Sequence, residues 1–174
     1  MVIESIISEY KRYKSLTQLA VEQLSEEELH RKFGDDGNSI AIIIKHLTGN
    51  LKSRFTNFLT EDGEKSWRDR DNEFEDKNET SKELLAKWNE AFEILFKQLE
   101  SMTDNNLNKI VKIRGNELTV AAALERSLAH TSYHVGQIVL MAKLYAGKEW
   151  KTLSIPKGGS KEYNKNPVKE KKPL

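Results

Sequence analysis

Residues 119–147 read TVAAALERSLAHTSYHVGQIVLMAKLYAG and predict one long helix near the end of the chain. Thr119 is a favourable N-cap residue, and Gly147 is of the type that commonly follows the last turn of a helix. One face of this helix is expected to point into the core, and the opposite side is also apolar, with residues such as Leu128 and Val135. The helix therefore needs cover on two sides, which predicts either the central helix of a bundle or a helix at a dimer interface.

Three further long helices are predicted upstream, because apolar residues repeat there at steps of three and four. They cover about residues 3–24, 39–58 and 80–102. Thr80 with Glu83 forms a capping-box pattern at the start of the third of these helices. Ser25 with Glu28 forms another, which predicts a short helical piece between the first two long helices.

Residues 109–118 predict a short β-hairpin, because β-branched side chains flank an Arg-Gly-Asn turn. We therefore predict an all-α four-helix bundle with a hairpin before the last helix, in one domain over residues 1–156. Residues 60–79 form an acidic connection with a net charge of −5, which is either a functional lid or a solvated excursion. Residues 157–174 have a net charge of +4 and predict a basic, irregular tail.

The composition excludes several classes of protein. The 174 residues include no cysteine, which excludes disulfides, thiolate metal sites and cysteine nucleophiles. With 28 basic and 27 acidic residues the net charge is +1, so nucleic acid is not expected as a partner. No apolar run of about 18 residues is present, so no membrane span is expected. The first residues lack the pattern of a signal peptide, which predicts a cytoplasmic location.

Two of the four histidines, His130 and His134, are four residues apart in the predicted last helix. This spacing places both imidazoles on one face, about 40° apart and nearly opposite Glu125 and Lys143. They are either an inert, hydrogen-bonded core pair or two ligands of one metal ion. The metal interpretation is favoured, because neighbouring imidazoles repel each other when protonated and lose hydration when they are buried without partners.

His46, in the predicted second long helix, is the candidate third ligand. It lies off the apolar stripe, so it is either a solvated residue or part of a polar cleft that Asn50, one turn later, would share. Three histidines suit Zn²⁺, Ni²⁺, Fe²⁺ or Co²⁺ without choosing among these metals. Residues that can orient the ligands are Arg126, Tyr133 and Gln137. His30 has no partner in the pattern and is predicted to lie at the surface.

The residues around these histidines resemble a known family. The stretches IIKHLTGN (43–50) and HTSYHVGQI (130–138) together resemble the DinB-like superfamily. The stretches WRDRDNEF (67–74) and SIPKGGS (154–160) are similar to a branch of uncharacterised bacterial proteins within it. The resemblance covers nearly the whole chain.

This resemblance implies an up-down-down-up four-helix bundle that is often dimeric. It implies a divalent metal bound by three histidines, which correspond here to His46, His130 and His134. Some members are metal-dependent transferases of low-molecular-weight thiols such as bacillithiol or mycothiol, and others resemble thiol-dependent isomerases or are named as hydrolases. A homodimer and a small-thiol cosubstrate are therefore expected.

Three functions stay open at this point. The first is a metal-dependent transferase in which a small thiol attacks a halide or an epoxide, with Arg68 and Arg70 as candidates for holding a carboxylate. The second is a hydrolase, which needs a carboxylate base. No acid shares the face of His130 and His134, so an aspartate or glutamate of residues 60–79 would have to supply it. The third is a non-catalytic, stress-related dimeric bundle that binds metal.

Overall fold

The structure is a computed structural model that describes residues 2–168. Four long helices make up about half of it, and short helices and one hairpin join them. In chain order the elements are α1 (Val2–Val21), α2 (Glu26–His30), α3 (Ile40–Phe55), η1 (Asp71–Phe74), α4 (Ser81–Glu100), η2 (Asp104–Asn106), β1 (Ile110–Ile113), β2 (Asn116–Thr119), α5 (Val120–Ala146), η3 (Gly147–Glu149) and α6 (Ser160–Tyr163). The short α6 lies within the predicted tail, whose last six residues are outside the described part of the chain.

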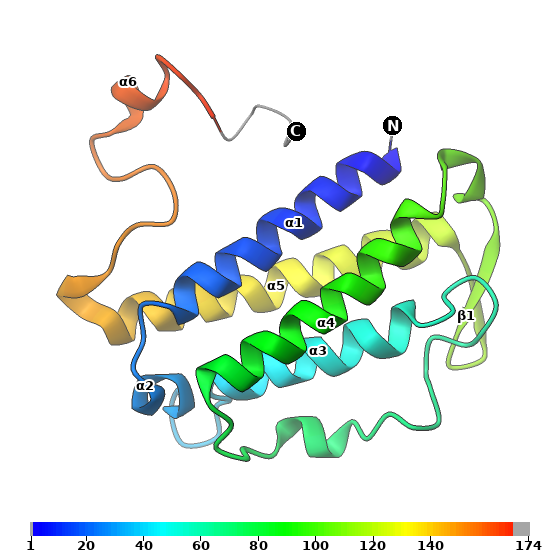
Figure 1. Cartoon of the computed structure of the whole chain (residues 1–174), viewed down its shortest axis with the longest axis horizontal. Coiled ribbons are helices and arrows are strands. Elements are labelled where there is room, and N and C mark those ends of the chain that lie inside the picture. The colour runs from blue at the N-terminus through cyan, green and yellow to red at the C-terminus, as the bar shows by residue number, and fades with distance from the viewer. Residues whose placement is uncertain (1, 169–174) are drawn as a thin grey trace.

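The long helices form a bundle in which α3 and α4 run in one direction and α1 and α5 in the other (Figure 1). The order is therefore up, down, down, up. α3 packs on α4 and α1 packs on α5, while α3 also contacts α5. Because α3 and α4 are parallel, the chain has to return along the whole bundle between them. The long connection at residues 60–79 follows from this topology.

Helices α2, α4 and α5 begin at the N-cap residues that the sequence predicts, and α5 also ends at the predicted glycine. Ser25 and Thr80 each accept a backbone hydrogen bond within a capping box, as predicted. The hydroxyls of Ser39 and Thr119 cap α3 and α5 in the same way. α5 ends at Gly147, whose φ of 54° lies in the left-handed region that glycine adopts without strain.

The predicted apolar stripes form one core between the long helices. Its largest fully buried side chains include Tyr10, Leu47, Phe55, Trp88, Phe92 and Leu124. α3 is shorter than predicted, because it ends at Phe55 and Asn57 adopts a left-handed φ of 50°. The turn that follows brings Phe58 back onto the core, where it is only 4% exposed.

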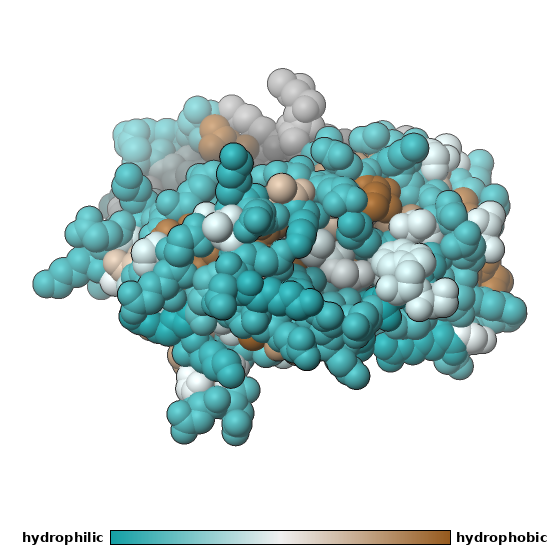
Figure 2. All heavy atoms as spheres, turned by 60° about the horizontal axis from the view of Figure 1, so that its bottom comes forward, coloured by the Kyte–Doolittle hydropathy of each residue, from teal (hydrophilic) through white to brown (hydrophobic). Residues whose placement is uncertain are grey.

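Residues 60–79 pack against α3 and the hairpin. The backbone N–H of Gly63 donates to the carbonyl of Lys112 at 2.8 Å. The Asp62 carboxylate accepts hydrogen bonds from the backbone N–H groups of Arg114 and Gly115, the two residues of the hairpin turn. Figure 2 turns this side of the molecule forward and shows a mostly hydrophilic face. The connection is therefore a packed wall of the domain rather than a solvated excursion.

One side of α5 packs against the other helices, as its apolar pattern predicts. Another side of α5 is exposed. Tyr133, Leu140 and Leu144 are 62%, 58% and 55% exposed. A homodimer through this helix stays a prediction. Within residues 2–168, none of the helices combines the length and apolar character needed to cross a membrane.

Candidate metal centre

Three histidines meet where α3 crosses α5. His46 comes from α3, and His130 and His134 come from successive turns of α5. One ring nitrogen from each residue lies within 4.8 Å of the other two, and the Nε2 atoms of His46 and His130 are 3.3 Å apart. Two nitrogens bound at about 2.0–2.1 Å to one tetrahedral ion are themselves about 3.3 Å apart. The spacing of these two nitrogens therefore fits a shared metal ion.

Hydrogen bonds at Nδ1 fix the orientation of two of the rings. Nδ1 of His46 lies 2.9 Å from a carboxylate oxygen of Glu73. Nδ1 of His134 lies 2.8 Å from the amide oxygen of Gln137. Both acceptors require Nδ1 to carry the proton, so each Nε2 presents a lone pair. This tautomer is the one that metal-bound histidines commonly adopt, with the other nitrogen donating outward.

Burial favours the neutral form of the two histidines on α5, His130 and His134. Burial, followed by the neighbouring His134 and His46 and by the charges of Arg68 and Arg54, lowers the pKa of His130 to about 4. Burial also lowers the pKa of His134, and the hydrogen bond with Gln137 only partly offsets this. Neutral rings are the metal-binding form, so protons do not compete for the nitrogens of His130 and His134 at pH 7.

Glu73 is a site residue that the sequence does not single out. It lies in η1, is 6% exposed, and accepts hydrogen bonds from both Nε and Nη2 of Arg68 at 2.8 and 2.9 Å. Burial raises the pKa of Glu73, but the hydrogen bonds from His46 and Arg68 outweigh this effect and lower it overall. Glu73 is one of nine acids in residues 60–79. In the sequence, only its position in the WRDRDNEF stretch (67–74) distinguishes Glu73 from the other acids.

Gly49 provides the space for this carboxylate. A Cβ atom added at Gly49, in the middle of α3, would lie 2.2 Å from Oε1 of Glu73. The carboxylate has little freedom to move, since Arg68 and His46 both hold it. A glycine inside a helix costs about 1 kcal/mol relative to alanine. The close approach of Glu73 explains why the position is glycine.

We expect Gly49→Ala to weaken metal binding by about tenfold or more, because the methyl group displaces the carboxylate that orients His46. Replacing glycine by alanine inside a helix usually raises the free energy of unfolding, but this substitution should not. Gly136→Ala in α5 is the matched control, because an added Cβ there has no neighbour within 4 Å. The control should raise the free energy of unfolding by about 0.5–1 kcal/mol and leave metal affinity unchanged. Urea unfolding of metal-free protein and competition with a chromophoric chelator measure both quantities, and equal behaviour of the two variants would contradict the role of Gly49.

The other candidate residues lie around the same centre. Asn50 and Arg126 line a cavity beside it. The Tyr133 ring packs edge-on against His134 with centroids 4.6 Å apart. Arg70 also lines the cavity, and its guanidinium lies over the Phe74 ring.

Two residues have partners that differ from the expectation. Arg68 was a candidate for holding a substrate carboxylate, but its bidentate face pairs with Glu73 of the chain itself. His30 was expected at the surface without a partner. Its Nδ1 instead pairs with Asp76 at 2.8 Å and its Nε2 donates to the carbonyl of Glu79, because the 60–79 connection folds back onto α2.

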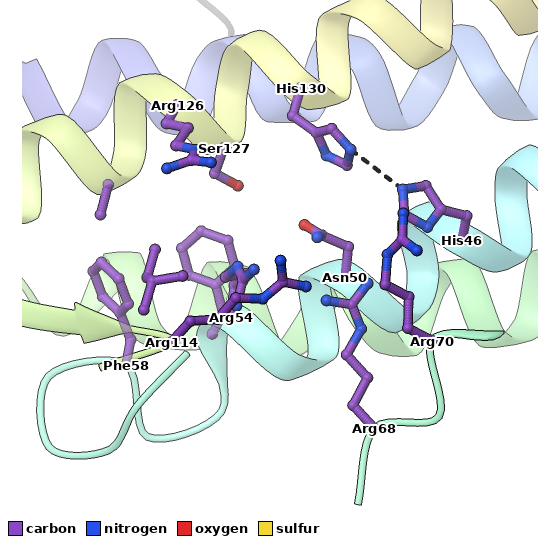
Figure 3. Close-up of a pocket in the computed structure, with 13 residues that line it drawn as sticks. His46, Asn50, Arg54, Phe58, Arg68, Arg70, Arg114, Arg126, Ser127 and His130 are labelled. Atoms are coloured by element: carbon purple, nitrogen blue, oxygen red, sulfur yellow. Dashed lines mark hydrogen bonds between the residues drawn. The ribbon is translucent and has the colours of Figure 1, made fainter. Parts of the chain in front are cut away.

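A cavity of about 280 Å³ opens beside His46 and His130 (Figure 3). It is bounded by α3, α5, the hairpin and residues 60–79. Its volume corresponds to about nine water molecules at 30 Å³ each. The candidate metal centre is therefore open to a small molecule on one side.

One protein-family model matches residues 1–159, and its description reads "Protein of unknown function (DUF1572)". The match includes all three histidines and Glu73. No match was found among curated proteins or among solved structures.

Proposed function

The chain belongs to the DUF1572 family of proteins of unknown function, and from its site we propose that it is a metal-dependent enzyme that transfers a low-molecular-weight thiol to a small electrophile. The observation that carries this proposal is the convergence of His46, His130 and His134 beside a cavity that His46 and His130 line. Within the described residues, this cluster contains three ligand residues and no fourth. Three protein ligands are typical of reactive rather than structural sites.

The donor set suits Zn²⁺, Ni²⁺, Fe²⁺ or Co²⁺. A divalent ion held there would lower the pKa of a bound thiol and so supply a sulfur nucleophile at neutral pH. Glu73 and Gln137 hold the rings of His46 and His134 in the metal-binding tautomer. Because the chain has no cysteine, the reacting thiol has to come from a cosubstrate. In the reaction the thiol loses its proton, sulfur bonds to the electrophilic carbon, and a halide leaves with its bonding electron pair.

The charges around the cavity favour thiol transfer over hydrolysis. A hydrolase would use a carboxylate as general base for the attacking water. No aspartate or glutamate is among the described residues that line the cavity. Glu73 is close, but it already accepts hydrogen bonds from His46 and Arg68, and its lowered pKa makes it a weak base.

We also propose that the family lies within the DinB-like superfamily. The up-down-down-up order of the long helices supports this, as does the position of one histidine on α3 and two on α5. Both features are expected from the resemblance of residues 43–50 and 130–138 to that superfamily.

The proposal is tested with untagged protein that is stripped by a chelator and reloaded separately with each of the four metals. We expect metal-dependent formation of the coloured thioether from 1-chloro-2,4-dinitrobenzene with at least one thiol among glutathione, cysteine, bacillithiol and mycothiol. The stripped protein is the control, and the rate should rise in proportion to enzyme concentration. No turnover with any thiol, in protein shown to be fully loaded, would reject the transferase and leave the metal centre standing.

A further inference from the structure

Five arginines from four segments of the chain surround the cavity. Arg54 comes from α3, Arg68 and Arg70 from the 60–79 connection, Arg114 from the hairpin turn and Arg126 from α5. Figure 3 shows them around the space that His46, Asn50 and His130 also border. Like charges repel, so gathering them on one small cavity lowers stability unless something negative binds among them.

The chain supplies too few carboxylates to neutralise these arginines. Glu64 lies 3.2 Å from Arg54, 3.5 Å from Arg68 and 3.1 Å from Arg114, so one carboxylate serves three guanidinium groups. Glu73 serves Arg68 and also His46.

Arg70 and Arg126 have no ion-pair partner in the part of the chain that the structure describes. The five arginine side chains carry three more positive charges than the two carboxylates that form ion pairs with them can neutralise, before any metal is counted.

Part of this charge is withdrawn from water. The side chains of Arg68 and Arg54 are only 2% and 15% exposed. Guanidinium groups with little hydration bind carboxylate and phosphate oxygens strongly, often through two parallel hydrogen bonds. Arg70 and Arg126 are exposed at the same cavity, which leaves their donors free for a ligand that enters from solvent.

Part of the cavity wall is apolar. Figure 3 shows Phe58 at the end away from His46, the Phe55 ring packs beside Phe58, and Ile113 also lines the cavity. A ligand that fills about 280 Å³ would therefore meet arginines along its length and a small apolar surface at one end.

We propose that this cavity binds a small organic molecule carrying at least two carboxylate or phosphate groups, with Arg70 and Arg126 as the residues that capture it from solvent. The inference deepens the proposed function, because the same ligand would lie beside the three histidines. The anionic molecule is then the thiol cosubstrate or the electrophile. Its binding is measurable without turnover, so the two proposals can fail separately.

The test is isothermal titration calorimetry of the full chain, with and without bound zinc. The probes are fructose 1,6-bisphosphate, which carries two phosphate groups, and tricarballylate, which carries three carboxylates, and sodium chloride of equal ionic strength is the reference. We expect binding of one or both organic anions in the metal-free protein, with an affinity that falls steeply as salt is added. Binding of the phosphate alone or of the carboxylate alone supports the proposal and identifies the anionic group.

Arg70→Gln combined with Arg126→Gln should weaken that binding by about tenfold or more, because each substitution removes a charge-assisted hydrogen bond. The double variant should load zinc like the unaltered protein, since both side chains are exposed and the described hydrogen bonds that orient the three histidines come from Glu73 and Gln137 rather than from these arginines. Arg31→Gln is the matched control, because it removes the same charge from a residue that does not line the cavity. Unchanged affinity in the double variant would overturn the proposal. So would anion binding that occurs only in the zinc-loaded protein, because the metal rather than the arginines would then hold the anion.

Discussion

Replacing His134 by alanine is expected to reduce bound metal from about one ion per chain to almost none. Two histidines would remain, and Gln137 would lose the ring that it orients. A two-ligand site holds divalent metal far more weakly than a three-ligand site, so the metal should be lost on dialysis. Elemental analysis of untagged protein measures this directly, because no affinity tag then contributes histidines.

Stability gives a second measurement of the same variant. A bound metal raises the unfolding temperature in proportion to the logarithm of its concentration over its dissociation constant. The unaltered protein should therefore show a higher Tm when zinc is added, and His134→Ala should show no such rise.

His30→Ala is the matched control, because His30 pairs with Asp76 and lies outside the cluster. It should lose some stability and keep its metal. Full metal occupancy in His134→Ala would reject the three-histidine centre.

The helices and the hairpin could be predicted from the sequence because their signals are local. A capping box spans four residues, as in Ser25 with Glu28 and Thr80 with Glu83, and both boxes form. An apolar stripe spans one helix, and the predicted stripes are buried. The parallel course of α3 and α4 came from the family resemblance, because nothing local in either helix fixes its direction.

The histidines were predicted by two different routes. His130 and His134 share a helix face, so the spacing alone brings them together. His46 is 84 residues from His130. The residue pattern of its own helix did not decide whether His46 was solvated or part of a cleft. The structure resolves this in favour of the cleft, because α5 and η1 cover the face that looked polar and leave His46 only 5% exposed.

Arg68, Arg70 and Arg126 were candidates from the sequence, whereas Glu73, Arg54 and Arg114 could not be selected from it. Glu73 lies 27 residues from His46, in a connection with eight other acids, and no periodic pattern marks it. The five arginines come from four segments, so their convergence depends on tertiary packing. Residues 60–79 carry a net charge of −5, yet Arg68 and Arg70 of that segment line the cavity together with three further arginines.

Glu73→Ala should have two separate effects. It removes the acceptor of His46 Nδ1–H, so the ring is no longer held in the metal-binding tautomer, and metal affinity should fall about 10- to 100-fold. It also leaves Arg68, whose side chain is 2% exposed, without its bidentate partner. Removing one partner of a buried ion pair costs about 3–5 kcal/mol of unfolding free energy. Glu64, 3.5 Å from Arg68, should keep the loss near the lower value.

A double variant separates these effects. In Arg68→Met with Glu73→Ala the unpaired buried cation is gone, so most of the lost stability should return, since apolar replacement of a whole buried pair is often close to neutral. Metal affinity should stay low, because His46 still lacks its acceptor. Glu75→Ala, an exposed acid two residues further along the same connection, should change neither quantity. Urea unfolding of metal-free protein and chelator competition report the two effects independently. Recovery of metal affinity in the double variant would mean that Glu73 acts only by neutralising Arg68, whereas failure to recover stability would mean that the carboxylate holds η1 against α3 by more than its charge.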